Sequence, residues 1–438
     1  MSDGGLRAEI SGQGIICNLA CSVLPKKQVN LWLDPKARLI LIANFLLVVG
    51  SGITWLAVPW FLIQEPNGNT IYGLSSAALT LLIFLLLPLL GKAIDRNSRK
   101  KVVLIYYVFA LVTNLIVIAM ILLQGRVETW HLVMVMSFGS LGVSIYYPAQ
   151  FAFNQEVLSR DQYRALSGAL EVQWQSGAMI AGGLATLLIN RIPLAAILVL
   201  DCCAYIAAFC VMSRVPYTRN PKLDANTGSA WNLMMEGFGY LQQRPRLSLV
   251  LLGSFLPFLG VMVCVYLTPV FINNALHAGP VVFGVAEASY SFGAVMAGLT
   301  IPWLSEKFGL MRTLLLTVAC YTVAVAVNPV FPAVAVFLGS LVLQGWGNAG
   351  SRVARSTIAL ETVPNELMGR VNLFYSALER LLRAVLIAIV TQQVAMSGAR
   401  SCYWTITGIG LCGWIMIACC RRFRRQHADP IAAPEKAV

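Results

Sequence analysis

Charged side chains are scarce in this chain. Asp, Glu, Lys and Arg together make up 12% of its 438 residues, whereas hydrophobic residues make up 58% and the mean hydropathy is +0.72. A soluble domain has about a quarter of its residues charged, because charged groups must cover its surface. The shortage of charge excludes a soluble protein and predicts an integral membrane protein that crosses the bilayer several times.

Histidine is rare, and acidic residues are outnumbered by basic ones. The chain has 3 His and 19 Asp or Glu against 32 Lys or Arg, which gives a net charge of +13. The cations stand beside apolar runs rather than on a polar domain, so we expect no nucleic-acid partner. The sequence has neither a Cys/His cluster of zinc spacing nor a Gly-x-x-x-x-Gly-Lys-Ser/Thr loop for ATP. We therefore expect no metal site, no cofactor and no enzyme activity.

Long apolar runs are what the chain has in place of charge. Twelve of them approach the roughly 20 residues that cross a bilayer as a helix. Their approximate ranges are 37–63, 71–91, 102–123, 130–154, 164–189, 192–213, 247–274, 279–303, 312–331, 333–356, 367–395 and 402–420. The sequence thus predicts an all-α integral membrane fold with twelve transmembrane helices.

The longest polar interruption lies between the sixth and seventh runs. It holds Pro216, Pro221 and Gly228, which are typical of a linker, and a short surface helix is predicted at 230–243. The predicted organisation is a tail at 1–36, a six-helix bundle at 37–213, a linker at 214–246, a second six-helix bundle at 247–420 and a tail at 421–438.

The distribution of Lys and Arg predicts the orientation in the membrane. Cations that flank short connections stay in the cytosol. On this rule both tails and the linker are cytosolic, and Arg126, Arg191 and Arg400 face outside. The basic run at 421–425 is expected to lie against anionic membrane lipid.

A short basic loop joins the second and third apolar runs. It contains the pattern Gly-x-x-x-Asp-Arg-x-x-Arg-Lys, which resembles the signature loop of the major facilitator superfamily. The matching residues are Gly91, Asp95, Arg96, Arg99 and Lys100. At Ser98 the family usually has Gly. The resemblance implies the major facilitator fold, in which this loop takes part in switching between inward- and outward-open states; the alternative is a charged loop that only anchors the topology.

An internal repeat supports two pseudo-symmetric halves. Gly50 and Pro59 in the first run are echoed by Gly260 and Pro269 in the seventh, and Glu306 stands where the second half repeats Asp95. Transporters built from such repeats bind their substrate near the membrane midplane, between the halves. The loop at 91–101 is expected to form a tight helical turn in which Gly91 lets the backbones approach and Asp95 pairs with arginines.

Ionisable residues inside apolar runs are costly and are therefore functional candidates. The six that stand well inside the expected spans are Glu171, Asp201, Glu287, Glu379, Arg380 and Arg383. Glu171 and Gln175 share a helix face, and Trp174 lies beside them, which suits an amphipathic ligand or a proton relay. The alternative is a hydrogen bond that only packs the bundle.

The remaining candidates have mixed interpretations. Glu287 is expected about 10 Å deep at 1.5 Å per residue, with no cation near it in sequence, and could carry a proton or make a structural hydrogen bond. Glu379 and Arg383 are four residues apart and can form an ion pair, which we expect to be structural or gating. The partner of Asp201 cannot be named from the sequence.

Several features resemble the macrolide-efflux and enterobactin-exporter subgroup of drug:proton antiporters. They are the loop at 91–101, the segment Val157–Gly177 and the lack of an arginine within the fourth run. The resemblance implies a monomeric transporter in a bacterial inner membrane that exports an amphipathic small molecule, siderophore or drug-like, in exchange for protons. An uptake or facilitated-diffusion carrier is the alternative; a membrane-embedded enzyme or sensor would need clustered motifs that the sequence lacks.

Overall fold

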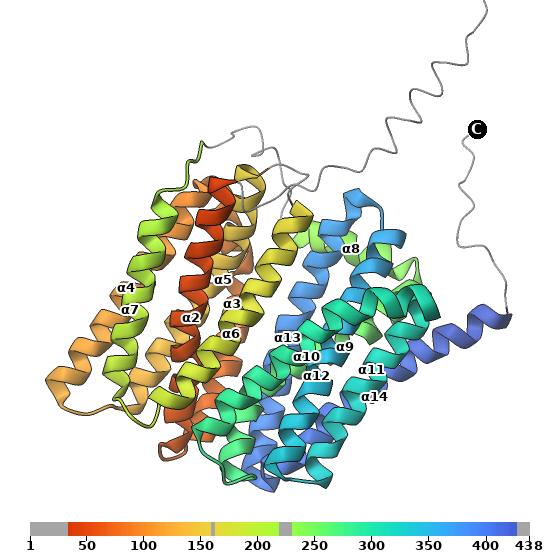
Figure 1. Cartoon of the computed structure of the whole chain (residues 1–438). Coiled ribbons are helices and arrows are strands. Elements are labelled where there is room, and N and C mark those ends of the chain that lie inside the picture. The colour runs from red at the N-terminus through yellow and green to blue at the C-terminus, as the bar shows by residue number, and fades with distance from the viewer. Residues whose placement is uncertain (1–33, 159–162, 219–229, 427–438) are drawn as a thin grey trace, which may run out of the picture.

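The computed structural model describes residues 34–158, 163–218 and 230–426. Thirteen helices and no strand lie within these ranges (Figure 1). The first bundle consists of α2 (Pro35–Gln64), α3 (Gly68–Arg96), α4 (Arg99–Gln124), α5 (Thr129–Val157), α6 (Tyr163–Leu188) and α7 (Leu194–Ser213). The second consists of α9 (Pro245–Asn274), α10 (Pro280–Phe308), α11 (Leu310–Val330), α12 (Val334–Thr362), α13 (Asn365–Ser397) and α14 (Ala399–Gln426), and the short α8 (Ala230–Gln242) precedes it. The predicted all-α fold of twelve long helices is confirmed.

Nine of the described helices are long and apolar enough to cross a membrane. Of the long helices, α6, α12 and α13 fall short of that hydropathy in the part of the chain that the structure describes. α12 carries Arg352 and Arg355, and α13 carries Glu379, Arg380 and Arg383 at similar depth. α12 and α13 are polar because they place these ionisable groups inside the protein rather than against lipid.

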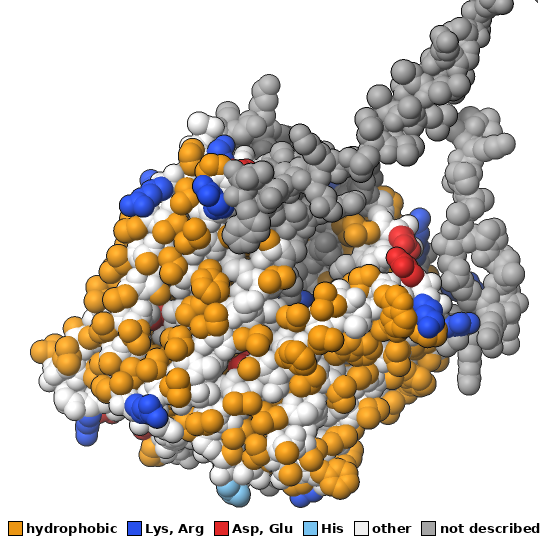
Figure 2. Space-filling model, in the orientation of Figure 1, with side chains coloured by type: hydrophobic (Ala, Val, Ile, Leu, Met, Phe, Trp, Pro, Cys, Tyr) orange, Lys and Arg blue, Asp and Glu red, His pale blue; other side chains and the backbone are white. Residues whose placement is uncertain are grey.

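The surface fits a bilayer. Large apolar side chains lie exposed along the sides of the helices, for example Leu85, Leu123 and Leu299. In Figure 2, hydrophobic side chains cover most of the visible face, and Lys and Arg lie toward its margins. An apolar belt of this extent marks a membrane-facing surface.

The link between α3 and α4 is shorter than expected. α3 continues to Arg96, so only Asn97 and Ser98 separate the two helices. The tight turn expected within 91–101 falls at Asn97 and Ser98, whereas Gly91 lies inside α3 and not in the turn. The side chains of residues 91–96, and so the expected pairing of Asp95, lie outside the described part. Ser98 has φ −60° and ψ 122°, an extended conformation that needs no glycine.

The corresponding link in the second half uses a glycine. Gly309 alone separates α10 from α11, and its φ is +83°. A residue with a Cβ rarely adopts this conformation, so glycine is required there. The two halves therefore make the same sharp connection by different backbone routes.

Among the residues that the structure describes, the buried apolar contact between the two bundles lies toward one end. We call the end that holds α8 and the α3–α4 link the linker end, and the other end the opposite end. One hydrophobic core, which includes Trp60, Tyr72, Tyr266 and Phe283, joins both bundles toward the opposite end. Toward the linker end each bundle has its own separate core. The described parts of the bundles therefore share a buried apolar seal at the opposite end and have separate cores toward the linker end.

Candidate functional site between the two bundles

The contact that seals the two bundles together at the opposite end includes the crossing of α6 and α10. A Cβ placed on Gly182 would lie 2.9 Å from the carbonyl oxygen of Gly284, and a Cβ on Gly284 would clash with the main chain at Gly182. The two backbones are thus in direct contact. Small residues allow such close approach of membrane helices.

Two tyrosines complete the seal on α3 and α9. Tyr72 donates its hydroxyl to the carbonyl oxygen of Val265 at 3.3 Å, and Tyr266 donates to the carbonyl oxygen of Asn69 at 3.2 Å. Their ring centroids are 5.2 Å apart. Each side chain reaches from its own bundle to the main chain of the other, so the pair fixes the register of the two halves.

Glu287 lies one turn beyond the glycine contact, on its linker-end side. Its Cβ would be 3.7 Å from a Cβ on Gly182, which places it at the boundary between the bundles. Tyr72 interacts electrostatically with both Glu287 and Arg383. Among described side chains, Glu287 has neither a hydrogen bond nor an ion pair. A half-buried carboxylate is thus held directly beneath the seal.

Further polar groups of the second bundle lie close by. The amide of Asn348 donates to the Tyr290 hydroxyl at 2.7 Å, which joins α12 to α10. On α13 the expected ion pair is present, with 3.7 Å between Arg383 Nη1 and Glu379 Oε1. We define the inter-bundle site as Tyr72, Glu287, Tyr290, Asn348, Glu379 and Arg383. It combines two carboxylates, one guanidinium, one amide and two phenols.

Arg383 is incompletely paired within this site. The 3.7 Å separation from Glu379 is long for an ion pair, and Arg383 Nη1 also approaches the sulfur of Met262 on α9 at 3.7 Å. Its Nε is buried and has no hydrogen-bond partner in the described part of the chain. A solute with an acceptor group could accept the hydrogen bonds that this guanidinium has left to donate.

The first bundle contributes aromatic and amide groups near the same level. Trp174 on α6 packs edge-on against Tyr147 on α5, with centroids 5.6 Å apart, and both rings remain more than 40% exposed. Gln175 is buried. The side chain of Glu171 lies outside the described part, so its predicted pairing with Gln175 stays a prediction.

Two arginines on α12 were missing from the sequence prediction. Arg352 and Arg355 lie about 10–15 Å inside the end of α12 at 1.5 Å per residue, whereas the expected span ended close to them. Arg355 Nη1 donates to the carbonyl oxygen of Ser254 at 3.3 Å, and its guanidinium lies 5.5 Å from the Phe255 ring centroid. In the sequence these residues stand at the end of the expected span and are interpreted as flanking cations, because α12 is longer than expected.

The C-terminal part of the signature loop bonds to residues at the linker end of the first bundle. Arg99 Nε lies 3.4 Å from Glu156 Oε1 at the end of α5, and Lys100 donates to the carbonyl oxygens of Ser213 and Val215, each at 2.7 Å. Tyr217 donates to the other oxygen of Glu156. Burial, together with this bond to Glu156, raises the pKa of Tyr217. The side chains of Gly91, Asp95 and Arg96 lie outside the described part.

Asp201 lies away from the inter-bundle site. It is buried within the first bundle, where the Asn114 amide donates to its Oδ2 at 3.0 Å. The structure therefore supplies the partner that the sequence could not name. Arg380 is half-buried on α13 beside Glu379.

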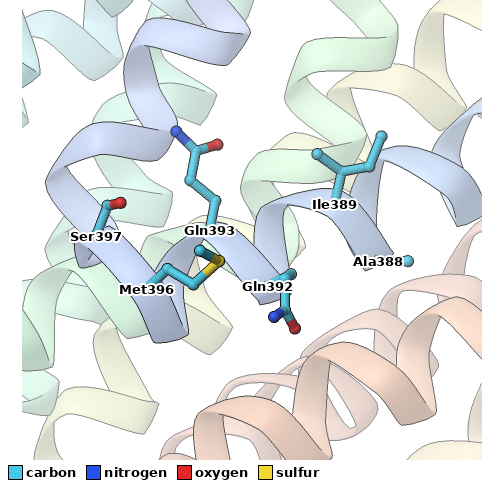
Figure 3. Close-up of a pocket in the computed structure, with 6 residues that line it drawn as sticks. All are labelled: Ala388, Ile389, Gln392, Gln393, Met396 and Ser397. Carbon is cyan, nitrogen blue, oxygen red and sulfur yellow. The ribbon is translucent and has the colours of Figure 1, made fainter.

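A separate groove of about 530 Å³ lies near the opposite end of α13 (Figure 3). Its lining residues are Ala388, Ile389, Gln392, Gln393, Met396 and Ser397. The side-chain oxygen of Gln393 accepts a hydrogen bond from the Thr405 hydroxyl at 2.8 Å, and Met396 is 76% exposed. The groove is open and largely apolar, and it shares no residue with the inter-bundle site. No group of three or more metal-ligating side chains occurs among residues 34–158, 163–218 and 230–426.

Comparison with known proteins gives concordant matches over most of the chain. The model of the Major Facilitator Superfamily matches residues 40–279 and 250–437. Macrolide efflux protein A of Streptococcus pyogenes is 21% identical over 286 residues, which cover 64% of this chain and 69% of that protein. These two matches rest on sequence alone.

Solved structures agree at the level of the fold. A bacterial homologue of the iron transporter ferroportin in its inward-facing state has a TM-score of 0.66 at 16% identity, covering 87% of this chain and 98% of that one. The nucleoside transporter NupG has a TM-score of 0.66 at 14% identity, covering 89% of this chain and all of its own. At these identities the likeness shows a shared fold and no shared substrate.

Proposed function

The chain belongs to the Major Facilitator Superfamily, and we propose that it is a proton-coupled exporter of an amphipathic small molecule. It is a multi-pass membrane transporter rather than an enzyme. The observation that carries the proposal is the polar inter-bundle site directly beneath the seal at the opposite end. This geometry suits alternating access, in which the bundles rock about a central site.

The orientation follows from the positions of the cations. Arg99, Lys100 and Lys101 lie at the linker end, with Lys307 and Arg312 near the corresponding link of the second half. Cations at short connections favour the cytosolic side. We therefore assign the linker end and both termini to the cytosol of a bacterium, with the chain in its inner membrane. In this assignment the described conformation is sealed toward the outside, and we infer that its site is reached from the cytosol.

Export requires the seal to open while the linker end closes. Opening would part Gly182 from Gly284 and Tyr72 from Tyr266, and would expose Glu287 to the outer face. Protons entering there would neutralise Glu287, which favours its return to the desolvated position beneath the seal. Glu171 is the second carboxylate proposed for coupling. The aromatic pair Trp174 and Tyr147 is proposed to contact apolar parts of the solute.

The distant macrolide-efflux relative supports the direction of transport. An amphipathic drug-like compound or a siderophore suits a site that combines aromatic rings with amides and few charges. Whole-chain similarity to transporters of iron and nucleosides concerns the fold and leaves the solute open to test.

Everted membrane vesicles test the proposal. We expect them to accumulate a macrolide or a catecholate siderophore when their interior is acidified, and to lose this accumulation when a protonophore is added. Glu287→Gln should reduce the rate at least tenfold. Glu361→Gln, at an exposed position of α12, should leave it unchanged.

Two results would count against the proposal. Accumulation that is independent of the proton gradient, or flux in the reverse direction, would favour an uptake or facilitated-diffusion carrier. Full gradient-driven activity in Glu287→Gln would remove Glu287 from the coupling mechanism.

A further inference from the structure

A carboxylate is enclosed within the first bundle, at a distance from the inter-bundle site. Asp201 on α7 is 2% exposed, and the groups around it come from α2 and α4. It is the eighth residue of α7, which puts it about 10 Å from the opposite end at 1.5 Å per residue. A buried carboxylate is stable only when it is paired, hydrogen-bonded or protonated.

The hydrogen bonds around Asp201 are incomplete for an anion. Oδ2 accepts one bond from the Asn114 amide at 3.0 Å. Oδ1 is buried without a partner, and so is the hydroxyl oxygen of Thr54, which lies beside the same carboxyl group. An ionised carboxylate could accept from two neutral donors at most, the Asn114 amide and the Thr54 hydroxyl, and its charge would stay unbalanced in an apolar core, which is costly.

A single proton satisfies both unpaired oxygens. If Oδ1 carries a hydrogen, it can donate to the Thr54 hydroxyl oxygen, while Oδ2 continues to accept from Asn114. The three side chains then form a closed set of two hydrogen bonds across α2, α4 and α7. The step adds one proton to Oδ1 and removes one negative charge, and no other bond changes.

The neighbours of Asp201 provide no countercharge. The titratable groups that face it are Cys202 and Tyr205 on α7 and Tyr106 on α4, and α2 contributes the neutral Thr54. None of the described side chains packed around it is a Lys, Arg or His. A bound cation or a proton is therefore required to balance the carboxylate.

The close packing beside the Asp201 carboxyl group favours a bound proton over a bound metal ion. A Cβ on Gly50 would clash with the side chain of Ala204 and would lie 3.8 Å from Asp201 Oδ1. α2 and α7 are therefore in close contact at this level. A metal ion would need several more oxygen ligands than Thr54 and Asn114 can supply.

Tyrosines connect this position with the linker end. Tyr205 is one turn along α7 from Asp201, and its ring lies 6.1 Å from that of Tyr106. Tyr106 lies 4.7 Å from Tyr146, whose hydroxyl donates to the Asn44 side chain at 2.7 Å. These buried hydroxyls continue from Asp201 toward the half of the bundle that we assign to the cytosol.

We propose that Asp201, Asn114 and Thr54 form a proton-binding site in the first bundle, separate from Glu287, that releases its proton toward the cytosol along the tyrosines. This assignment rests on the proposed proton-coupled function. Protonation allows tight packing of α2 against α7, and release leaves an uncompensated charge between them. The site thereby makes the packing of the first bundle depend on the proton it holds.

Infrared difference spectroscopy of the purified protein in lipid nanodiscs tests the site directly. We expect a carbonyl band of a protonated carboxylic acid at neutral pH. This band should vanish in Asp201→Asn and shift in Thr54→Val, which removes the acceptor. Cys203→Ser, an exposed neighbour on the same helix, should leave it unchanged. In everted vesicles Asp201→Asn, which mimics the neutral acid, should reduce gradient-driven transport at least tenfold while solute binding is retained.

The outcomes separate this site from the function on which it rests. A band that persists in Asp201→Asn shows that the acid lies elsewhere and overturns the assignment, as does loss of the band on addition of sodium at constant pH. Normal gradient-driven transport in an Asp201→Asn variant that lacks the band also overturns it, because the proton would be uncoupled. An intact band in a wild-type protein that shows no proton-driven flux supports the site and rejects the proposed export.

Discussion

Tyr72 and Tyr266 hold the two bundles together by reciprocal hydrogen bonds, each from a side chain to the main chain of the other helix. Neither bond can survive opening of the opposite end, because the donor and acceptor move with different bundles. The pair therefore stabilises the conformation in which the opposite end is closed.

Removing these hydroxyls should favour the outward-open state. Each net hydrogen bond contributes about 1 kcal/mol, so Tyr72→Phe and Tyr266→Phe should each shift the equilibrium about fivefold. Labelling of the buried Cys264 by a membrane-impermeant thiol reagent from outside, with the other cysteines replaced by alanine, measures the shift. Tyr240→Phe, which removes a bond to the Thr362 carbonyl oxygen at the linker end, is the control. Equal labelling in all variants would contradict the assigned seal.

The glycine crossing offers a steric test. Gly284→Ala should force α6 and α10 apart, since overpacking costs about 1–3 kcal/mol, and should lower the inward-open population about tenfold or more. Gly183→Ala is the matched control, because a Cβ on Gly183 meets no atom within 4 Å. The same labelling assay distinguishes the two; identical behaviour would mean that the crossing does not limit opening.

The ion pair between Arg99 and Glu156 should stabilise the linker end of the first bundle. Breaking a buried pair costs about 3–5 kcal/mol, so Glu156→Gln should lower the Tm clearly in a thermal unfolding assay. Arg126→Gln breaks the more exposed pair with Glu128, and its effect should be about 0–1 kcal/mol. A Tm of Glu156→Gln no lower than that of Arg126→Gln would show that the loop is only a topology anchor.

Glu379 and Arg383 should behave as a coupled pair. Arg383→Gln leaves Glu379 without its partner, and Glu379→Gln leaves the guanidinium uncompensated, so each should impair transport more than the double substitution. A coupling free energy of about 0.5–3 kcal/mol is expected for residues in contact. Additive effects in a double-mutant cycle of transport rates would show that the two groups act independently.

Much of the fold could be predicted because the bilayer restricts the options. Runs of about 20 apolar residues can only be helices there, and the helices lie close to the expected ranges. The end of α12 was less predictable, since a helix extends into water without a change in periodicity. Arg352 and Arg355 were missed for this reason.

The candidate site was only partly predictable. Glu287, Glu379 and Arg383 could be found because ionisable groups in apolar runs are conspicuous. Neutral partners give no such signal: Tyr72 and Tyr290 look like ordinary aromatic residues, and Asn114 lies 87 residues from Asp201 in sequence. Only the packing of distant helices brings these groups together, and a single sequence does not reveal that packing.

The central claim is that the seal at the opposite end opens when the linker end closes. Spin labels at Gln64→Cys and Asn274→Cys report the distance across the opposite end, and labels at Lys101→Cys and Lys307→Cys report the linker end, in each case in a protein without other cysteines. Electron–electron double resonance in nanodiscs should show the first distance increase and the second decrease when solute and pH are varied. Distances that stay constant at both ends, or that change in the same direction, would contradict alternating access.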